Sequence, residues 1–241
     1  MVRPFTLTRL IDLLRLIRVY KKVEPELVAD SMMTSKDRAL ELLRQAEDMG
    51  FIVHNDHKYS MTRIGYEFFE AFKNNDRERL DELLSRYPPY LCIKNILSKR
   101  SASLSELSEI TGLTEVSVET IIRLMRYTCD DLCTVAGKFY LRRNELPSLK
   151  HFIEILKQVY KELNTNLWGC PKEFIRMDQV ARRVCMELRL KMVDFSRLLK
   201  EAQRRYRFIE VYSEGTGFDF LPYHARFSLS NHRRCFIRIR L

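Results

Sequence analysis

The sequence predicts a mainly α-helical protein with small β-hairpins (α+β), built from three similar units in tandem. The 241 residues are 46% hydrophobic and 31% charged, with only 7 Gly and 7 Pro, which is typical of a globular chain and excludes disorder and collagen-like repeats. Stretches with helical spacing of apolar residues are followed by two short strand-like runs. This order occurs three times, which predicts domains at residues 1–75, 76–146 and 147–241.

The first unit shows the pattern most clearly. Pro25 favours the start of a helix, Ser35 is placed to cap another, and Gly50 ends it. Two short strands then flank a polar turn, which predicts a small β-wing. The expected elements are helices over residues 8–21, 25–34 and 36–49, strands over 51–54 and 58–61, and a helix over 62–73.

The run from Met49 to Gly65, MGFIVHNDHKYSMTRIG, resembles the wing and following helix of winged helix-turn-helix proteins. In that superfamily the segment reads as a glycine, a strand, a hairpin and a Tyr-x-Leu-Thr-x-x-Gly run. Met61 stands where Leu is usual, a tolerated apolar exchange. The resemblance covers about 65 residues and implies the fold without indicating a target. We therefore expect three tandem winged-helix domains, each with a three-helix core and a small β-wing.

The second unit begins with a linker helix and a Tyr-Pro-Pro break at residues 87–89. Ser103 and Glu106 have the spacing of a capping box. The segment LSELSEITGLTEVSVETIIRLM is strongly like a helix-turn-helix, and two short strands after it predict a second wing.

The third unit is less regular. A long helix is expected from Pro147, a second helix over residues 177–189, and a third that Asp194 caps. Strands over residues 208–212 and 235–239 flank a long loop. This arrangement predicts an enlarged wing.

The positive charge is concentrated in the third unit. The chain has 42 Lys and Arg against 32 Asp and Glu, a net charge of +10. Residues 1–147 contain 23 basic and 22 acidic side chains, whereas residues 148–241 contain 19 and 10. Because binding to a basic segment releases counterions from a polyanion, nucleic acid is the expected partner. An anionic membrane surface is the second partner that charge alone allows.

Other features predict the compartment. No apolar stretch approaches the roughly 18–20 residues of a membrane span, and no signal peptide is evident. The 6 cysteines lack the paired spacing of a structural zinc site. We expect a cytoplasmic protein with reduced thiols and no membrane partner.

In helix-turn-helix proteins the second helix of the motif enters the major groove, and the wing reaches the backbone or minor groove. In the second unit this helix carries Glu115 and Glu119, which would repel phosphates, so that unit is expected to act as a spacer or a protein-binding surface. The third unit is the strongest candidate, with Arg189 in support and the first unit assisting. The predicted nucleic-acid-binding residues are Lys36, Arg38, Arg44, Arg182, Arg183, Arg197, Lys200, Arg204, Arg205, Arg226, Arg233 and Arg234.

The long final loop interleaves basic side chains, such as Arg226 and Arg233, with aromatic ones. This pattern suits a wing that follows the phosphate backbone or a platform that stacks unpaired bases. The alternative is that the aromatic residues pack a small sheet while the arginines are solvated. On the closing strand, Arg238 and Arg240 share a face, which favours phosphate contacts over the protection of a sheet edge.

Enzyme chemistry has little support. The sequence contains no P-loop, no Gly-rich dinucleotide turn, no His-Glu-x-x-His and no serine elbow. His54 and His57 flank the first wing turn, and His224 and His232 lie in the last loop, but such pairs are more often solvated than metal-bound. We expect no catalytic activity, no metal and no other cofactor.

The preferred interpretation is a DNA-binding protein, a transcriptional regulator or a DNA-maintenance factor, that contacts double-stranded DNA mainly through its C-terminal domain. Single-stranded nucleic acid is an alternative ligand. Tandem arrays of this kind resemble transcription regulators and the winged-helix arms of transcription-initiation and chromosome-maintenance assemblies in archaea and eukaryotes. The rival interpretation is a scaffold subunit that binds proteins through its second domain, as tandem winged helices do in membrane-remodelling and condensin-like complexes. An enzyme hidden in the third unit is a third, weaker alternative.

Overall fold

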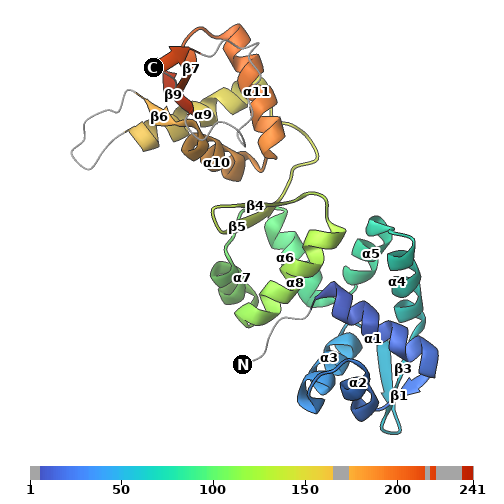
Figure 1. The fold of residues 1–241 in the computed structure, drawn as a ribbon. Coiled ribbons are helices and arrows are strands. Elements are labelled where there is room, and N and C mark those ends of the chain that lie inside the picture. Colours follow the sequence, from blue (N-terminus) through green and yellow to red (C-terminus); the bar gives the residue numbers. More distant parts are fainter. Residues whose placement is uncertain (1–5, 165–173, 215–217, 221–234, 241) are drawn as a thin grey trace. The chain divides into compact units, whose positions relative to one another are not determined.

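The computed structural model shows helices and small antiparallel sheets, which confirms the predicted mainly helical α+β class (Figure 1). None of the helices in the described part of the chain is long and apolar enough to cross a membrane. The structure describes residues 6–164, 174–214, 218–220 and 235–240.

The contacts divide the chain into two compact units. The expected division into three winged-helix domains stays a prediction. The hairpin expected as the second wing, at residues 132–141, lies almost entirely in the second unit, whereas the helices before it belong to the first unit. The first unit consists of Met1–Ile96 and Ala102–Leu132, and the second of Leu97–Ser101 and Cys133–Leu241.

The N-terminal half of the first unit contains three helices, a three-stranded antiparallel sheet and a fourth helix. The side chains of Thr6, Ser35 and Thr62 each cap a helix by accepting a backbone N–H three residues on. The sheet order is β1-β3-β2. The elements are α1 (Leu7–Tyr20), β1 (Lys22–Val23), α2 (Pro25–Ser31), α3 (Lys36–Asp48), β2 (Ile52–Asn55), β3 (Lys58–Met61) and α4 (Arg63–Lys73).

The predicted hairpin is present, and it has a partner strand that the sequence did not reveal. Lys22 of β1 pairs with Ser60 of β3, which covers the second edge of that strand. Two residues are too short to show the alternation that identifies a strand. At the hairpin turn, Asp56 and His57 have φ angles of 48° and 63°, as the tight turns that match hairpin twist require.

Gly65 allows α4 to approach the backbone that precedes β2. A Cβ at this position would lie 2.1 Å from the carbonyl oxygen of Phe51. Thr62 stabilises the same junction with two hydrogen bonds. Its backbone N–H donates to the carbonyl oxygen of Phe51 at 2.9 Å, and its hydroxyl donates to the carbonyl oxygen of Gly50 at 2.6 Å. The ring of Phe51 stacks on Phe68 in the core, with 4.3 Å between centroids.

Four further helices complete the first unit. The predicted capping box is confirmed, since Ser103 accepts from the backbone N–H of Glu106 and the carboxylate of Glu106 accepts from that of Ser103. Gly112 ends the following helix with a φ of 69°. The helices are α5 (Arg77–Leu84), α6 (Pro88–Leu97), α7 (Leu104–Thr111) and α8 (Glu115–Thr128).

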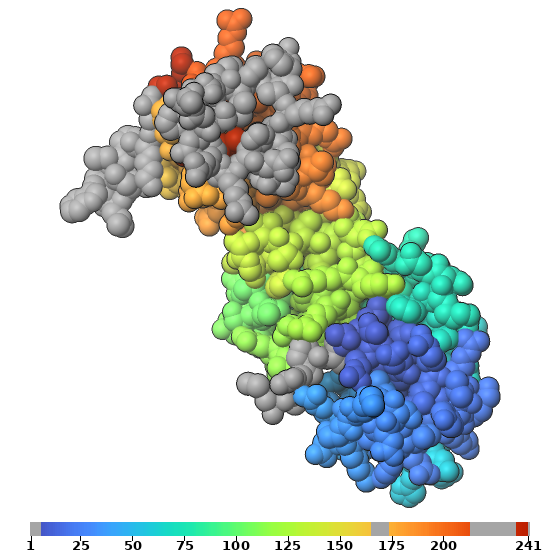
Figure 2. All heavy atoms as spheres, in the orientation of Figure 1, coloured from blue at the N-terminus to red at the C-terminus, as the bar shows by residue number. Residues whose placement is uncertain are grey.

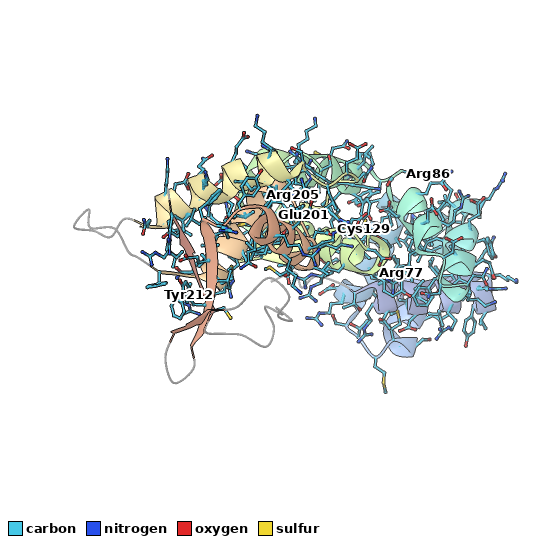
Figure 3. All side chains as sticks on the ribbon, turned by 90° about the horizontal axis from the view of Figure 1, so that it is seen from above. Arg77, Arg86, Cys129, Glu201, Arg205 and Tyr212 are labelled. Atoms are coloured by element: carbon cyan, nitrogen blue, oxygen red, sulfur yellow. The ribbon has the colours of Figure 1, made fainter. Side chains whose placement is uncertain are left out.

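A half-buried polar cluster ties α5, α6 and the end of α8 together. The carboxylate of Asp81 accepts hydrogen bonds from the hydroxyl of Tyr90 at 2.6 Å, from the thiol of Cys129 at 2.9 Å and from the ammonium of Lys94. Burial and the bond to Asp81 raise the pKa of Cys129, labelled in Figure 3, to about 11. The thiol therefore remains a proton donor at neutral pH.

The second unit contains the hairpin β4-β5 and three helices packed on a four-stranded sheet of order β6-β9-β7-β8. The rings of Phe152 and Phe195 meet edge to face at 5.7 Å in its core. The elements are β4 (Leu132–Val135), β5 (Lys138–Leu141), α9 (Leu149–Asn164), β6 (Ile175–Arg176), α10 (Met177–Leu188), α11 (Met192–Arg205), β7 (Ile209–Glu214), β8 (Phe218–Phe220) and β9 (Cys235–Ile239).

The two units repeat one pairing pattern. In the first unit, the two-residue strand β1 follows α1 and pairs antiparallel with β3, which also pairs with β2. In the second unit, the two-residue strand β6 follows α9 and pairs antiparallel with β9, which also pairs with β7. The orders β1-β3-β2 and β6-β9-β7 therefore correspond element by element. The strands predicted over residues 208–212 and 235–239 are confirmed as β7 and β9, whereas β6 and β8 were not predicted.

The expectation that Asp194 caps α11 is wrong. Lys191 occupies the N-cap position, and Asp194 lies inside the first turn with its side chain 9% exposed. The carboxylate is held there by the guanidinium groups of Arg142, at 3.1 Å, and Arg197, at 3.6 Å. Arg142 comes from the segment after β5, so the spacing along the chain could not reveal this pair.

Candidate nucleic-acid interface

The helix α11 has one buried face and one basic face. Its apolar residues, including Phe195, Leu198 and Leu199, are buried against the rest of the second unit. In Figure 2 the atoms of α11, in orange, reach the surface of that unit. The outward side chains line an open hollow of about 450 Å³ and consist of four cations and one carboxylate: Arg197, Lys200, Glu201, Arg204 and Arg205.

Two cations of this basic face, Lys200 and Arg205, are at most weakly neutralised, whereas Arg197 lies 3.6 Å from the buried carboxylate of Asp194. Arg205, labelled with Glu201 in Figure 3, pairs with that carboxylate at 2.9 Å, and both side chains are exposed. Lys200 makes no ion pair with any residue that the structure describes. Exposed ion pairs contribute about 0 to 1 kcal/mol, so a phosphate can replace the carboxylate at little cost. The basic face is therefore available to a polyanion.

The two predicted arginines of α10 are also exposed, but they have acidic neighbours. Arg182 lies 3.8 Å from a carboxylate oxygen of Asp178, and Arg183 lies 3.3 Å from one of Glu162. Because both pairs are solvated, they weaken the local positive potential without removing it.

The first unit offers fewer predicted cations than α11. Lys36 pairs with Glu26 at 2.5 Å, and that hydrogen bond raises the pKa of Lys36. Arg38 and Arg44 are exposed and form no ion pair with other described residues. Acidic side chains such as Asp37 share the helix α3. The assisting role predicted for this unit thus depends on two arginines.

Three predicted site residues, Arg226, Arg233 and Arg234, lie outside the described residues, as do His224 and His232. On β9, Cys235, Ile237 and Ile239 are buried, so Arg238 lies on the opposite face, as predicted, and Arg240, directly after the strand, is exposed. Both are engaged within the unit. The guanidinium group of Arg240 pairs with Glu210 at 2.6 Å, and that of Arg238 lies 5.8 Å from the ring centroid of Phe174.

Arg189 was predicted to support the basic face of α11, but it is not among the residues that line that face. It ends α10 in the left-handed conformation, with a φ of 52°, and its carbonyl oxygen accepts the N–H of Arg143 at 3.2 Å. Sequence reasoning missed Arg142 and Arg143, although a pair of arginines directly after a predicted strand was a visible signal.

The described part of the chain contains no group of three or more His, Cys, Asp and Glu side chains that could hold a metal ion. His54 and His57 are 6.5 Å apart between ring centroids. His54 instead stacks on Tyr59 at 4.5 Å, which gives it a packing role in the hairpin.

Comparisons with known proteins give no further information on the interface. No protein-family model matches the chain, and a search of curated proteins finds no match to it.

Proposed function

We propose that the chain is a winged-helix protein that binds duplex DNA mainly through the basic face of α11. The single observation that carries this proposal is the set of four exposed or half-exposed cations on that helix, with one carboxylate among them. A polyanion that docks on this face would release counterions with each phosphate contact, which supplies sequence-independent affinity.

The order of elements supports the winged-helix assignment. In each unit the basic or candidate reading helix is the third helix, and it precedes the strand that starts the wing. Helices in this position enter the major groove in helix-turn-helix proteins, and the wing contacts the neighbouring backbone. On this basis α11 would be the reading helix, α3 would assist, and β7 to β9 would form the enlarged wing.

The experiment compares wild type with the triple variant Arg197→Gln, Lys200→Gln and Arg204→Gln in binding to duplex DNA across a salt series. If each cation contacts one phosphate, the slope of log K against log salt should decrease by about 2.7, and affinity at 0.1 M salt should decrease about 100-fold or more.

A matched control is the triple variant Lys150→Gln, Lys161→Gln and Arg207→Gln. It removes the same charge from exposed positions elsewhere in the second unit. The control should lose much less affinity. Equal losses in the two triple variants would show that net charge, not the α11 face, determines binding, and an unchanged affinity of the first variant would refute the proposal.

A second candidate function is a scaffold subunit that binds a protein partner. The observation in its favour is a hollow of about 420 Å³ lined by α1 and by the end of α2 and the residues after it, where Val19, Tyr20 and Met33 are 68%, 54% and 94% exposed beside the charged Arg9, Asp12 and Arg15. A partner surface on residues 76–146 stays a prediction. Failure of the wild-type chain to bind duplex or single-stranded DNA at physiological salt would favour this function.

A further inference from the structure

The second unit contains a second cluster of cations, formed by Arg142, Arg143 and Arg189. The first two follow β5, and Arg189 ends α10. The backbone hydrogen bond from Arg143 to Arg189, at 3.2 Å, holds the two segments side by side. All three arginines line an open hollow of about 530 Å³, together with Ser98, Asn144, Glu145, Leu146 and Pro147.

The charges in this hollow are not balanced. Arg142 is paired with Asp194, but Arg143 and Arg189 form no ion pair with any described residue. The Nε atoms of Arg142 and Arg189 are both buried and lack a hydrogen-bond partner in the described part of the chain. Burial and the neighbouring charge of Arg143 both lower the pKa of Arg189. Two like charges and a buried unpaired donor are unfavourable unless an anion joins them.

The geometry favours a tetrahedral oxyanion. A guanidinium group has five N–H donors in a planar fork, which suits the several oxygens of a phosphate. Ser98 and Asn144, which also line the hollow, carry hydroxyl and amide groups that donate hydrogen bonds. Only one lining residue, Glu145, is acidic.

We propose that Arg143 and Arg189 bind a phosphate group in this hollow, with Arg142 held in position by Asp194. Asp194 bridges the cluster to the basic face of α11, because its second carboxylate oxygen lies 3.6 Å from Arg197. The phosphate is either a phosphodiester of the DNA backbone or the phosphate of a small free ligand. The first source rests on the proposed function, whereas phosphate binding itself does not.

The first test titrates the full-length protein with inorganic phosphate at constant ionic strength, with sodium chloride as the balancing salt. The readout is the NMR cross-peaks of the arginine Nε–H groups, assigned with the single variants Arg143→Gln and Arg189→Gln. The Arg189 cross-peak should shift in a saturable way in the wild type, and Arg207→Gln, which removes an exposed arginine of the same unit, should leave that shift unchanged. Because this readout uses the wild-type chain, it does not depend on the folding of a variant.

The second test repeats the titration with a short DNA duplex and measures the salt dependence of the double variant Arg143→Gln and Arg189→Gln. A phosphodiester ligand requires that DNA shift the same cross-peak and that the salt slope of the double variant decrease by about 0.9. A response to inorganic phosphate alone would support the free-ligand source. No saturable response to either probe would overturn the proposal.

The two proposals can fail separately. The triple variant of α11 should lose DNA affinity while it keeps the response of Arg189 to inorganic phosphate. Failure of DNA binding in the wild type would refute the proposed function, and the phosphate titration would still test the hollow.

Discussion

Replacement of Gly65 by alanine tests whether the close approach of α4 to the strand hairpin determines the stability of the first unit. The added Cβ would lie 2.1 Å from the oxygen of Phe51 and 2.9 Å from Cγ of Met61. The obstacle is a backbone carbonyl, which cannot rotate away as a side chain would. The two backbones must therefore separate by about 1.3 Å to reach an ordinary contact.

The expected cost follows from three contributions. Overpacking of this kind costs about 1 to 3 kcal/mol, and each hydrogen bond of Thr62 that lengthens with the separation contributes about 1 kcal/mol. Alanine recovers about 0.5 to 1 kcal/mol because it is a better helix former than glycine. We expect Gly65→Ala to lower the free energy of unfolding of the first unit by about 2 kcal/mol.

The assay is urea unfolding combined with hydrogen exchange at the amides of β3 and α4, because in a chain with two compact units hydrogen exchange reports the stability of the first unit by itself. Thr62→Ala is the comparison variant, because without a steric clash it removes the helix cap and the hydrogen bond from the hydroxyl to Gly50, and it should cost about 2 kcal/mol. An alanine at position 65 that stabilises the unit, as helix propensity alone predicts, would refute the steric argument.

Two further predictions concern the polar cluster around Asp81. Burial acts to raise the pKa of Asp81, but hydrogen bonds from Cys129, Lys94 and Tyr90 outweigh it and lower the pKa below the usual value. The stabilisation is therefore present above the unfolded pKa and is lost as the pH falls through the lower folded pKa. Urea midpoints should accordingly fall as the pH drops below about 4 in the wild type, and less so in Asp81→Asn. Because the pKa of Cys129 is raised to about 11, iodoacetamide at pH 8 should alkylate it much more slowly than the exposed Cys92; equal rates by mass spectrometry would contradict the buried, hydrogen-bonded thiol.

The elements that the sequence predicts well are those with local signals. Ser35 and Ser103 cap helices where their spacing indicated, and the Asn-Asp-His turn joins two strands. The alternation on β9 is also correct, because Cys235, Ile237 and Ile239 are buried while Arg238 faces the other side. These signals need only a few consecutive residues.

The features that the sequence does not reveal depend on contacts between distant segments. The strands β1 and β6 have only two residues each, and they are strands because a partner strand has a free edge beside them. Asp194 was predicted to be a helix cap because its ion-pair partner, Arg142, is 52 positions earlier in the chain and could not be identified from local spacing. For the same reason, the hollow that joins Arg143 to Arg189 could not be inferred before the fold was known.

The paired short strands also have a consequence for folding kinetics. The pair of β1 with β3 closes a loop between Lys22 and Ser60, and the pair of β6 with β9 closes a longer one between Ile175 and Ile237. The longer loop is less than twice the shorter, so its extra closure entropy is less than about 0.6 kcal/mol. The sheet of the first unit is complete at Met61, about halfway through that unit, whereas the sheet of the second unit needs β9, close to the end of that unit. On the ribosome the first sheet can therefore form while α5 to α8 are still being synthesised, whereas the second sheet can form only after nearly all of its unit has been made.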